Sequence, residues 1–207
     1  PPPGTAKAVA AVLGAQAALK AHAPALAHEL DQPWGQQNQQ EMSWLLEKVK
    51  GAKSVLEIGS CFGRTLEHIA SVMQPGGLVR SIDLGRSDDC LPGVDTITPL
   101  RAIIAKLKAQ GFDANVLIAD SHTPAAIKTA GKRAPYDLVF VDGDHTEAGV
   151  LADWKAYGPM GRMVAFHDIA NPGLGVKPVW EKIKASGYRT EEIVNTPDYL
   201  GIGIVYQ

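Results

Sequence analysis

A carboxylate beside a glycine-rich turn is the first feature of this sequence that can carry chemistry. Residues 55–70 read VLEIGSCFGRTLEHIA, with Glu57 just before Gly59 and with Gly63 at the end of the turn. A glycine loop between a strand and a helix lets backbone N–H groups approach a ligand closely. The dinucleotide-binding form of this loop is G-x-G-x-x-G, which holds a pyrophosphate. The middle glycine of that pattern is missing here.

The charge of Glu57 discriminates between the ligands that such a loop can bind. A carboxylate at the end of the strand repels a diphosphate and suits a cation. S-adenosylmethionine carries a sulfonium and an α-ammonium, together with a carboxylate that the amides of Gly59, Ser60 and Gly63 can hold. The sequence therefore favours a methyl donor over NAD at this position.

Two further polar positions follow the next expected strands. Asp83, with Leu84 after it, ends the second strand, where an acidic side chain accepts hydrogen bonds from both ribose hydroxyls. Asp120 and Ser121 end the third strand, where a polar pair can meet the adenine edge. Taken singly, each carboxylate is more simply a partner of a helix dipole or a solvated loop residue. Their order at successive strand ends favours cofactor binding.

Apolar periodicity predicts strands that alternate with helices. This pattern predicts a parallel sheet with right-handed crossovers, covered on both faces. The last two strands are too close in sequence for a crossover helix, so we expect them to pair antiparallel. The expected strands are 54–58, 78–83, 115–120, 136–142, 161–168, 188–194 and 200–206, and the expected helices are 42–49, 63–73, 100–107, 123–130, a segment through 150 and 154, and 176–187.

Length and composition exclude several classes of protein. The chain has 207 residues, a net charge of −2 and two cysteines. No apolar run approaches the ~20 residues that cross a bilayer, and no basic stripe predicts nucleic-acid binding. Two cysteines make no disulfide framework, so we expect a reducing, cytoplasmic location. Residues 1–32 form an alanine-rich extension, expected to be helical over 5–22 and suited to a homodimer contact, and 33–207 form the main domain.

Several segments resemble the class I S-adenosylmethionine-dependent methyltransferases. The similarity is carried by VLEIGSCFGRT, SIDLG, VLIADS, YDLVFVDGDHTEAGVLADW and GRMVAFHDI, and it extends from about Trp34 to Tyr206. The last two segments resemble small-molecule O-methyltransferases, in the branch of macrolide-sugar methyltransferases and cephalosporin-hydroxylase-like proteins. This resemblance implies a Rossmann-like α/β/α sandwich with strand order 3-2-1-4-5-7-6. The implied reaction methylates a hydroxyl of a sugar, a catechol-like diol or a natural-product scaffold.

The resemblance also implies roles for residues in the second half of the chain. In metal-dependent relatives, the positions of Asp142, His167 and Asp168 bind a divalent cation such as Mg²⁺ or Mn²⁺, and the position of His145 is the general base. We also expect Asp142 to contact the cofactor. Relatives usually have a carboxylate at the position of His167, and an imidazole there shifts the preference toward Mn²⁺, Fe²⁺ or Zn²⁺.

Simpler roles and other functions stay open at this point. His145 can serve only as a helix cap, Asp142 as a loop carboxylate, and His167 as a substrate contact. Trp34 and Gln39 can close over the ligand or can merely pack and be solvated. On the same fold, the chain can also be a metal-dependent hydroxylase or hydrolase, although Glu57 would then have no clear role. A binding protein without catalytic activity is the third alternative.

Overall fold

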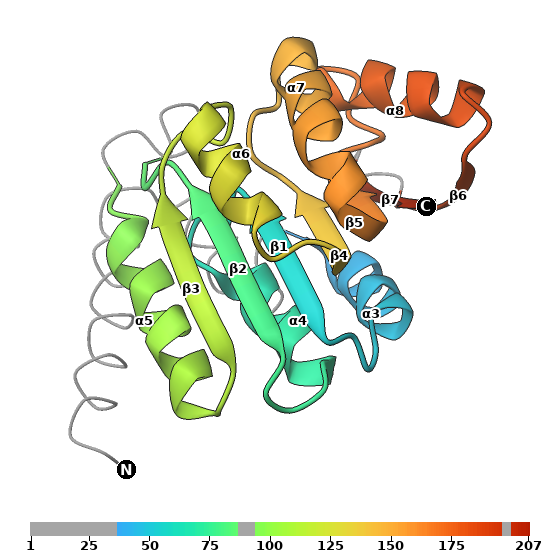
Figure 1. Ribbon diagram of the computed structural model, residues 1–207. Helices are drawn as coiled ribbons and strands as arrows, with labels where there is room; N and C mark the ends of the chain where they lie inside the picture. The colour runs from blue at the N-terminus through green and yellow to red at the C-terminus, as the bar shows by residue number, and fades with distance from the viewer. Residues whose placement is uncertain (1–36, 87–93, 196–199) are drawn as a thin grey trace.

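A seven-stranded sheet forms the centre of the computed structural model, which describes residues 37–86, 94–195 and 200–207 (Figure 1). The strand order is β3-β2-β1-β4-β5-β7-β6, as the resemblance implies. β1 to β5 pair parallel, and β7 pairs antiparallel with both β5 and β6, which confirms the expected C-terminal hairpin. The strands are β1 (Ser54–Ile58), β2 (Leu78–Asp83), β3 (Asp113–Ile118), β4 (Tyr136–Val141), β5 (Gly161–Phe166), β6 (Arg189–Asn195) and β7 (Leu200–Tyr206).

Helices cover both faces of this sheet and enclose two apolar cores. One core lies against α3, α4 and α5, and the other lies against α6, α7 and α8. Figure 1 shows α6 and α7 on the near face of the sheet. Burial on both faces explains why the central strands read as continuous apolar runs. The helices are α3 (Gln39–Lys48), α4 (Arg64–Val72), α5 (Ile97–Ala109), α6 (Pro124–Gly131), α7 (Glu147–Tyr157) and α8 (Val176–Ala185).

Some expectations concern residues outside the described ranges. They are the alanine-rich extension with its expected helix over 5–22, Trp34, and the short connection between the last two strands. Among residues 37–86, 94–195 and 200–207, no helix has both the length and the apolar character needed to cross a bilayer.

The carboxyl ends of β1 and β4 approach each other closely at the glycine loop. Gly59 has a φ of +80°, and a Cβ atom there would lie 2.2 Å from the carbonyl oxygen of Asp142. Only glycine fits this contact, because a side chain would collide with backbone. Cys61 and Asp168 also have positive φ values, 47° and 61°, which is uncommon for residues other than glycine and is concentrated at functional sites. The sheet therefore holds a tightly packed, strained edge at the expected site.

Candidate functional site

Glu57 is a fully buried carboxylate at the floor of the glycine loop. It lies on β1 with 0% exposure, and neither of its oxygens has a hydrogen-bond partner among the described residues. Burial raises the pKa of Glu57 to about 8, and the charges of Asp142 and Asp83 reinforce this; the nearby Ser60 hydroxyl, which pairs with the Ser81 hydroxyl (2.7 Å), opposes it. An unpaired buried acid is costly, so it keeps a proton or awaits a cationic partner. A positively charged group of a ligand would offset the cost of burying this carboxylate.

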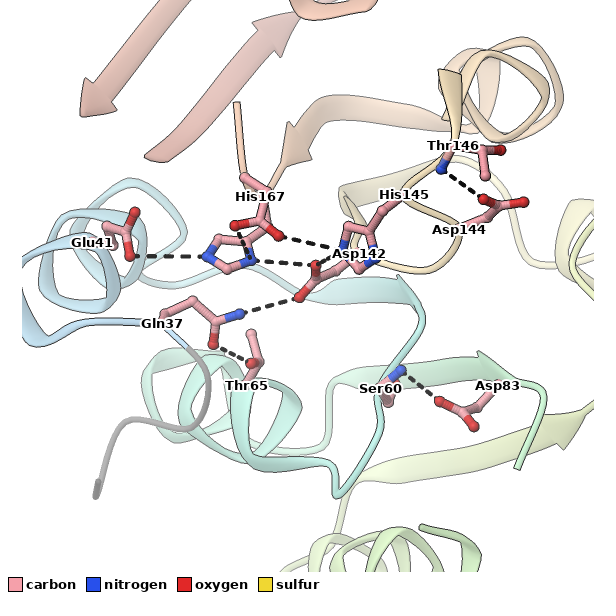
Figure 2. A network of polar contacts seen from close by, with 11 residues as sticks. Gln37, Glu41, Ser60, Thr65, Asp83, Asp142, Asp144, His145, Thr146 and His167 are labelled. Carbon is pink, nitrogen blue, oxygen red and sulfur yellow. Dashed lines mark hydrogen bonds and ion pairs between the residues drawn. The ribbon is translucent and has the colours of Figure 1, made fainter. Parts of the chain in front are cut away.

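Asp83 holds the glycine loop through the backbone. One carboxylate oxygen accepts hydrogen bonds from the N–H groups of Ser60 (2.9 Å) and Cys61 (2.8 Å), and the other accepts from Gly85 (2.6 Å). Figure 2 shows the contact between Ser60 and Asp83. A carboxylate has about four acceptor sites, so three bonds leave capacity for a ligand. The expected ribose contact stays a prediction, and the structure adds a loop-tethering role that the sequence did not indicate.

The loop after β3 presents polar groups near the same edge. The Asp120 side chain is exposed and accepts a hydrogen bond from the N–H of His122 (2.8 Å). The Ser121 hydroxyl instead donates inward to Asp153 on α7 (2.9 Å). Leu84 follows β2 with 53% of its surface exposed, which leaves an apolar side chain free to cover a ligand ring.

Two aspartates and two histidines converge at the ends of β4 and β5 (Figure 2). The Nε2 atom of His145 lies 3.4 Å from carboxylate oxygens of both Asp142 and Asp168. The Nδ1 atom of His167 lies 3.3 Å from Asp142 and 3.8 Å from Asp168. One ligand atom from each of Asp142, His145 and Asp168 falls within 4.8 Å of the others, a compact group that can hold a cation. His145, expected to be the base, thus completes this group, and His167 lies directly beside it.

The four side chains shift one another's protonation. Burial disfavours ionised Asp142, but the charge of His167 and the hydrogen bond from His145 hold the pKa of Asp142 below its ordinary value. The hydrogen bond to Asp142 raises the pKa of His145. Burial would lower the pKa of His167, yet Asp142 outweighs burial and raises it well above the ordinary value. Burial raises the pKa of Asp168. Asp142 is therefore the anionic centre of the cluster.

Helix α3 and the segment just before it supply site residues that sequence reasoning missed. The buried Gln37 side chain donates to Asp142 (3.2 Å) and accepts from the Thr65 hydroxyl (2.5 Å), so it bridges β4 and α4. Glu41, with 0% exposure, lies 3.9 Å from Nε2 of His167. Gln39, for which a ligand contact and a solvated amide were both open, is exposed, which agrees with the solvated alternative.

A signal for one of these residues was present in the sequence. Asn38 and Glu41 form a capping box at the start of α3, a pattern recognisable from their three-residue spacing. Asp144, next to the cluster, accepts a hydrogen bond from the N–H of Thr146 (2.8 Å), and Thr146 is itself the N-cap of α7.

Comparison with known protein families identifies the fold and its family. A family model described as a methyltransferase domain matches residues 56–169, which is more than half of the chain. The chain belongs to this methyltransferase family. The resemblance found in the sequence is thereby confirmed, and the matched range includes every predicted site residue of the methyltransferase from Glu57 to Asp168. Among curated proteins, none matches the chain.

Solved structures share the fold of this methyltransferase along most of its length. An O-methyltransferase from Bacillus cereus in complex with SAH is 18% identical, with a TM-score of 0.63, and the match covers 97% of this chain and 91% of that one. The O-methyltransferase TomG from Streptomyces achromogenes, in complex with SAM, is 20% identical, with a TM-score of 0.61 over 95% and 88% of the two chains. At these identities the likeness shows the fold alone.

Proposed function

We propose that this methyltransferase transfers a methyl group from S-adenosylmethionine to a hydroxyl of a small molecule. The observation that carries the proposal is Glu57, a buried carboxylate without a partner at the floor of a glycine loop. A donor that brings an ammonium and a sulfonium relieves this carboxylate, whereas a dinucleotide brings two more negative charges. The solved relatives in complex with SAH and SAM support the same cofactor.

Groups along the three strand ends match the parts of the cofactor. The predicted amide contacts with its carboxylate are not supported, because the N–H groups of Gly59, Ser60 and Gly63 already donate to the Ile82 carbonyl, to Asp83 and to the Ser60 carbonyl. Asp83 retains acceptor capacity for a ribose hydroxyl. At the loop after β3, the Asp120 carboxylate accepts hydrogen bonds, and the N–H of Ser121 has no partner among the described residues. An acceptor beside a donor complements the adenine edge, where an amino group lies beside a ring nitrogen.

The aspartate–histidine cluster supplies the acceptor side of the reaction. Asp142, His145 and Asp168 would hold a divalent cation, and their mixed oxygen and nitrogen donors fit Mn²⁺, Fe²⁺ or Zn²⁺ better than Mg²⁺. When bound, such a cation lowers the pKa of a coordinated hydroxyl. A coordinated His145 has no free nitrogen lone pair, so its predicted role as general base requires that Asp142 and Asp168 hold the cation while His145 takes up the hydroxyl proton; His167 orients Asp142. Ligation by His167, predicted from the resemblance, stays a prediction.

The acceptor class and the setting of the enzyme are also part of the proposal. We expect a sugar, catechol-like diol or natural-product hydroxyl as acceptor, and no nucleic-acid or membrane partner. The homodimer, the cytoplasmic location and the division at residue 33 stay predictions from the sequence.

Transfer of a labelled methyl group tests the proposal. The full chain is incubated with methyl-labelled S-adenosylmethionine and a panel of sugars, diols and phenolic compounds, with Mn²⁺ or with a chelator. Label in at least one hydroxyl compound supports the function, and loss of transfer with chelator supports the cation. Cofactor binding without transfer to any acceptor would favour the binding protein. Hydrolysis or hydroxylation without cofactor binding would favour the other enzyme class.

A further inference from the structure

Two residues on one face of helix α7 form hydrogen bonds with the loop after β3. Asp153 and Tyr157 lie one turn apart, so both side chains reach the same neighbour. Asp153 accepts a hydrogen bond from the Ser121 hydroxyl (2.9 Å), and the Tyr157 hydroxyl donates to the Ser121 carbonyl oxygen (2.6 Å). The side chain and the carbonyl of Ser121 are therefore both directed toward the helix.

Burying the Asp153 carboxylate costs more free energy than a purely structural contact with the loop requires. Its side chain is fully buried, and one carboxylate oxygen has no hydrogen-bond partner among the described residues. His122 lies 3.3 Å from the other oxygen. Burial raises the pKa of Asp153 to about 6, so the ionised form is disfavoured by its surroundings. A buried carboxylate with one unpaired oxygen costs free energy, and such costs are typical of functional positions.

These two hydrogen bonds determine which polar groups of the loop remain available to a ligand. Because its hydroxyl and carbonyl engage α7, Ser121 is left with an N–H group that has no partner in the described part of the chain. The neighbouring Asp120 carboxylate is exposed. Adenine offers a ring-nitrogen acceptor beside an amino donor, which fits this pair. A 6-oxopurine has a ring N–H donor beside a carbonyl acceptor. Its donor would face the N–H of Ser121, and its acceptor would face the Asp120 carboxylate.

We propose that Asp153 is a positioning residue that fixes the Ser121 loop so that the cofactor site selects adenine over a 6-oxopurine. This inference rests on the proposed function, because it assumes an adenosyl cofactor at the β3 loop. Asp153 acts through Ser121 and does not touch the ligand itself. Base selectivity is therefore the property that it controls, in addition to any effect on stability.

Titration calorimetry with S-adenosylhomocysteine and S-inosylhomocysteine measures this selectivity directly. In Asp153→Asn, which keeps the size and the acceptor oxygen but removes the charge, we expect the preference for the adenosyl ligand to shrink by up to about tenfold, the difference in strength between a hydrogen bond to a carboxylate and one to a neutral amide. Glu147→Gln is the matched control, because Glu147 lies on the same helix, is exposed and pairs with Lys182 away from the loop. The control should keep the wild-type preference.

A double-mutant cycle separates positioning from general damage. If Asp153 acts through the Ser121 hydroxyl, Asp153→Asn should change the preference little further in a Ser121→Ala background. Tyr157→Phe removes the hydrogen bond to the Ser121 carbonyl oxygen, so it should also reduce the preference for the adenosyl ligand. This variant replaces Asp153→Asn in the test if Asp153→Asn does not fold. A wild-type preference in Asp153→Asn, or in Tyr157→Phe where that variant replaces it, overturns the inference. Wild-type protein without affinity for S-adenosylhomocysteine overturns the proposed function itself.

Discussion

Replacement of Glu57 by glutamine tests the origin of the cofactor preference. In the unfolded chain this carboxyl has its ordinary pKa of 4.5, whereas in the fold burial raises the pKa to about 8. Between these two values the folded state binds the proton that the unfolded state has lost. Stability contributed by this group is therefore greatest at low pH and is lost as pH rises from about 4.5 toward 8.

The size of the effect follows from the same two pKa values. At pH 7 the folded protein must keep Glu57 protonated, which costs about 3 kcal/mol relative to an ionised carboxyl in the unfolded chain. Glutamine has the same shape and carries no such cost. We expect Glu57→Gln to be up to about 3 kcal/mol more stable than wild type at pH 7 without ligand, with the difference closing toward pH 5.

Urea unfolding between pH 5 and pH 8.5, followed by circular dichroism, measures this difference. The same variant should bind S-adenosylhomocysteine at least about tenfold more weakly, because the ligand ammonium loses its anionic partner. Opposite changes in stability and affinity identify a group kept for function. A stability difference that does not depend on pH, or an unchanged affinity, would refute the assignment of Glu57.

Other variants test neighbouring parts of the site. Gly59→Ala should cost about 3 kcal/mol or more in urea unfolding, because its Cβ would lie 2.2 Å from backbone, whereas Gly111→Ala, with open space around it, should cost about 1 kcal/mol. Asp83→Ala should weaken S-adenosylhomocysteine binding more than it lowers stability, and unchanged affinity would count against the ribose contact. His145→Asn should abolish methyl transfer and retain S-adenosylhomocysteine binding; full transfer would exclude His145 as the base. In wild type, transfer should rise with pH through a value above the usual histidine range, since Asp142 raises the pKa of His145.

The fold was predictable because its signals are local. Apolar runs of five to eight residues between amphipathic segments predict a parallel sheet, and the short spacing of the last two strands predicts their antiparallel pairing. Strand ends then place Glu57, Asp83 and Asp142 at one edge of the sheet, as observed. Local periodicity and topology carry this information without any knowledge of side-chain contacts.

The contacts within the site were less predictable because they join distant segments. Gln37 and Asp142 are 105 residues apart, and nothing in the sequence around Gln37 indicates that its amide reaches the cluster. Asp83 is an acidic residue at the expected position, but only the tertiary structure shows that its carboxylate accepts hydrogen bonds from the loop amides. Whether His145 or His167 completes the compact group depends on how each side chain leaves its strand, which the spacing of the residues does not determine.

Binding of the cofactor tests the central claim most directly, since the whole account requires an adenosyl ligand that brings an ammonium group to Glu57. Titration calorimetry of the full chain at pH 7 compares S-adenosylhomocysteine with NADH. We predict saturable binding of S-adenosylhomocysteine and no detectable heat from NADH. Saturable binding of NADH, together with no affinity for S-adenosylhomocysteine, would contradict the account.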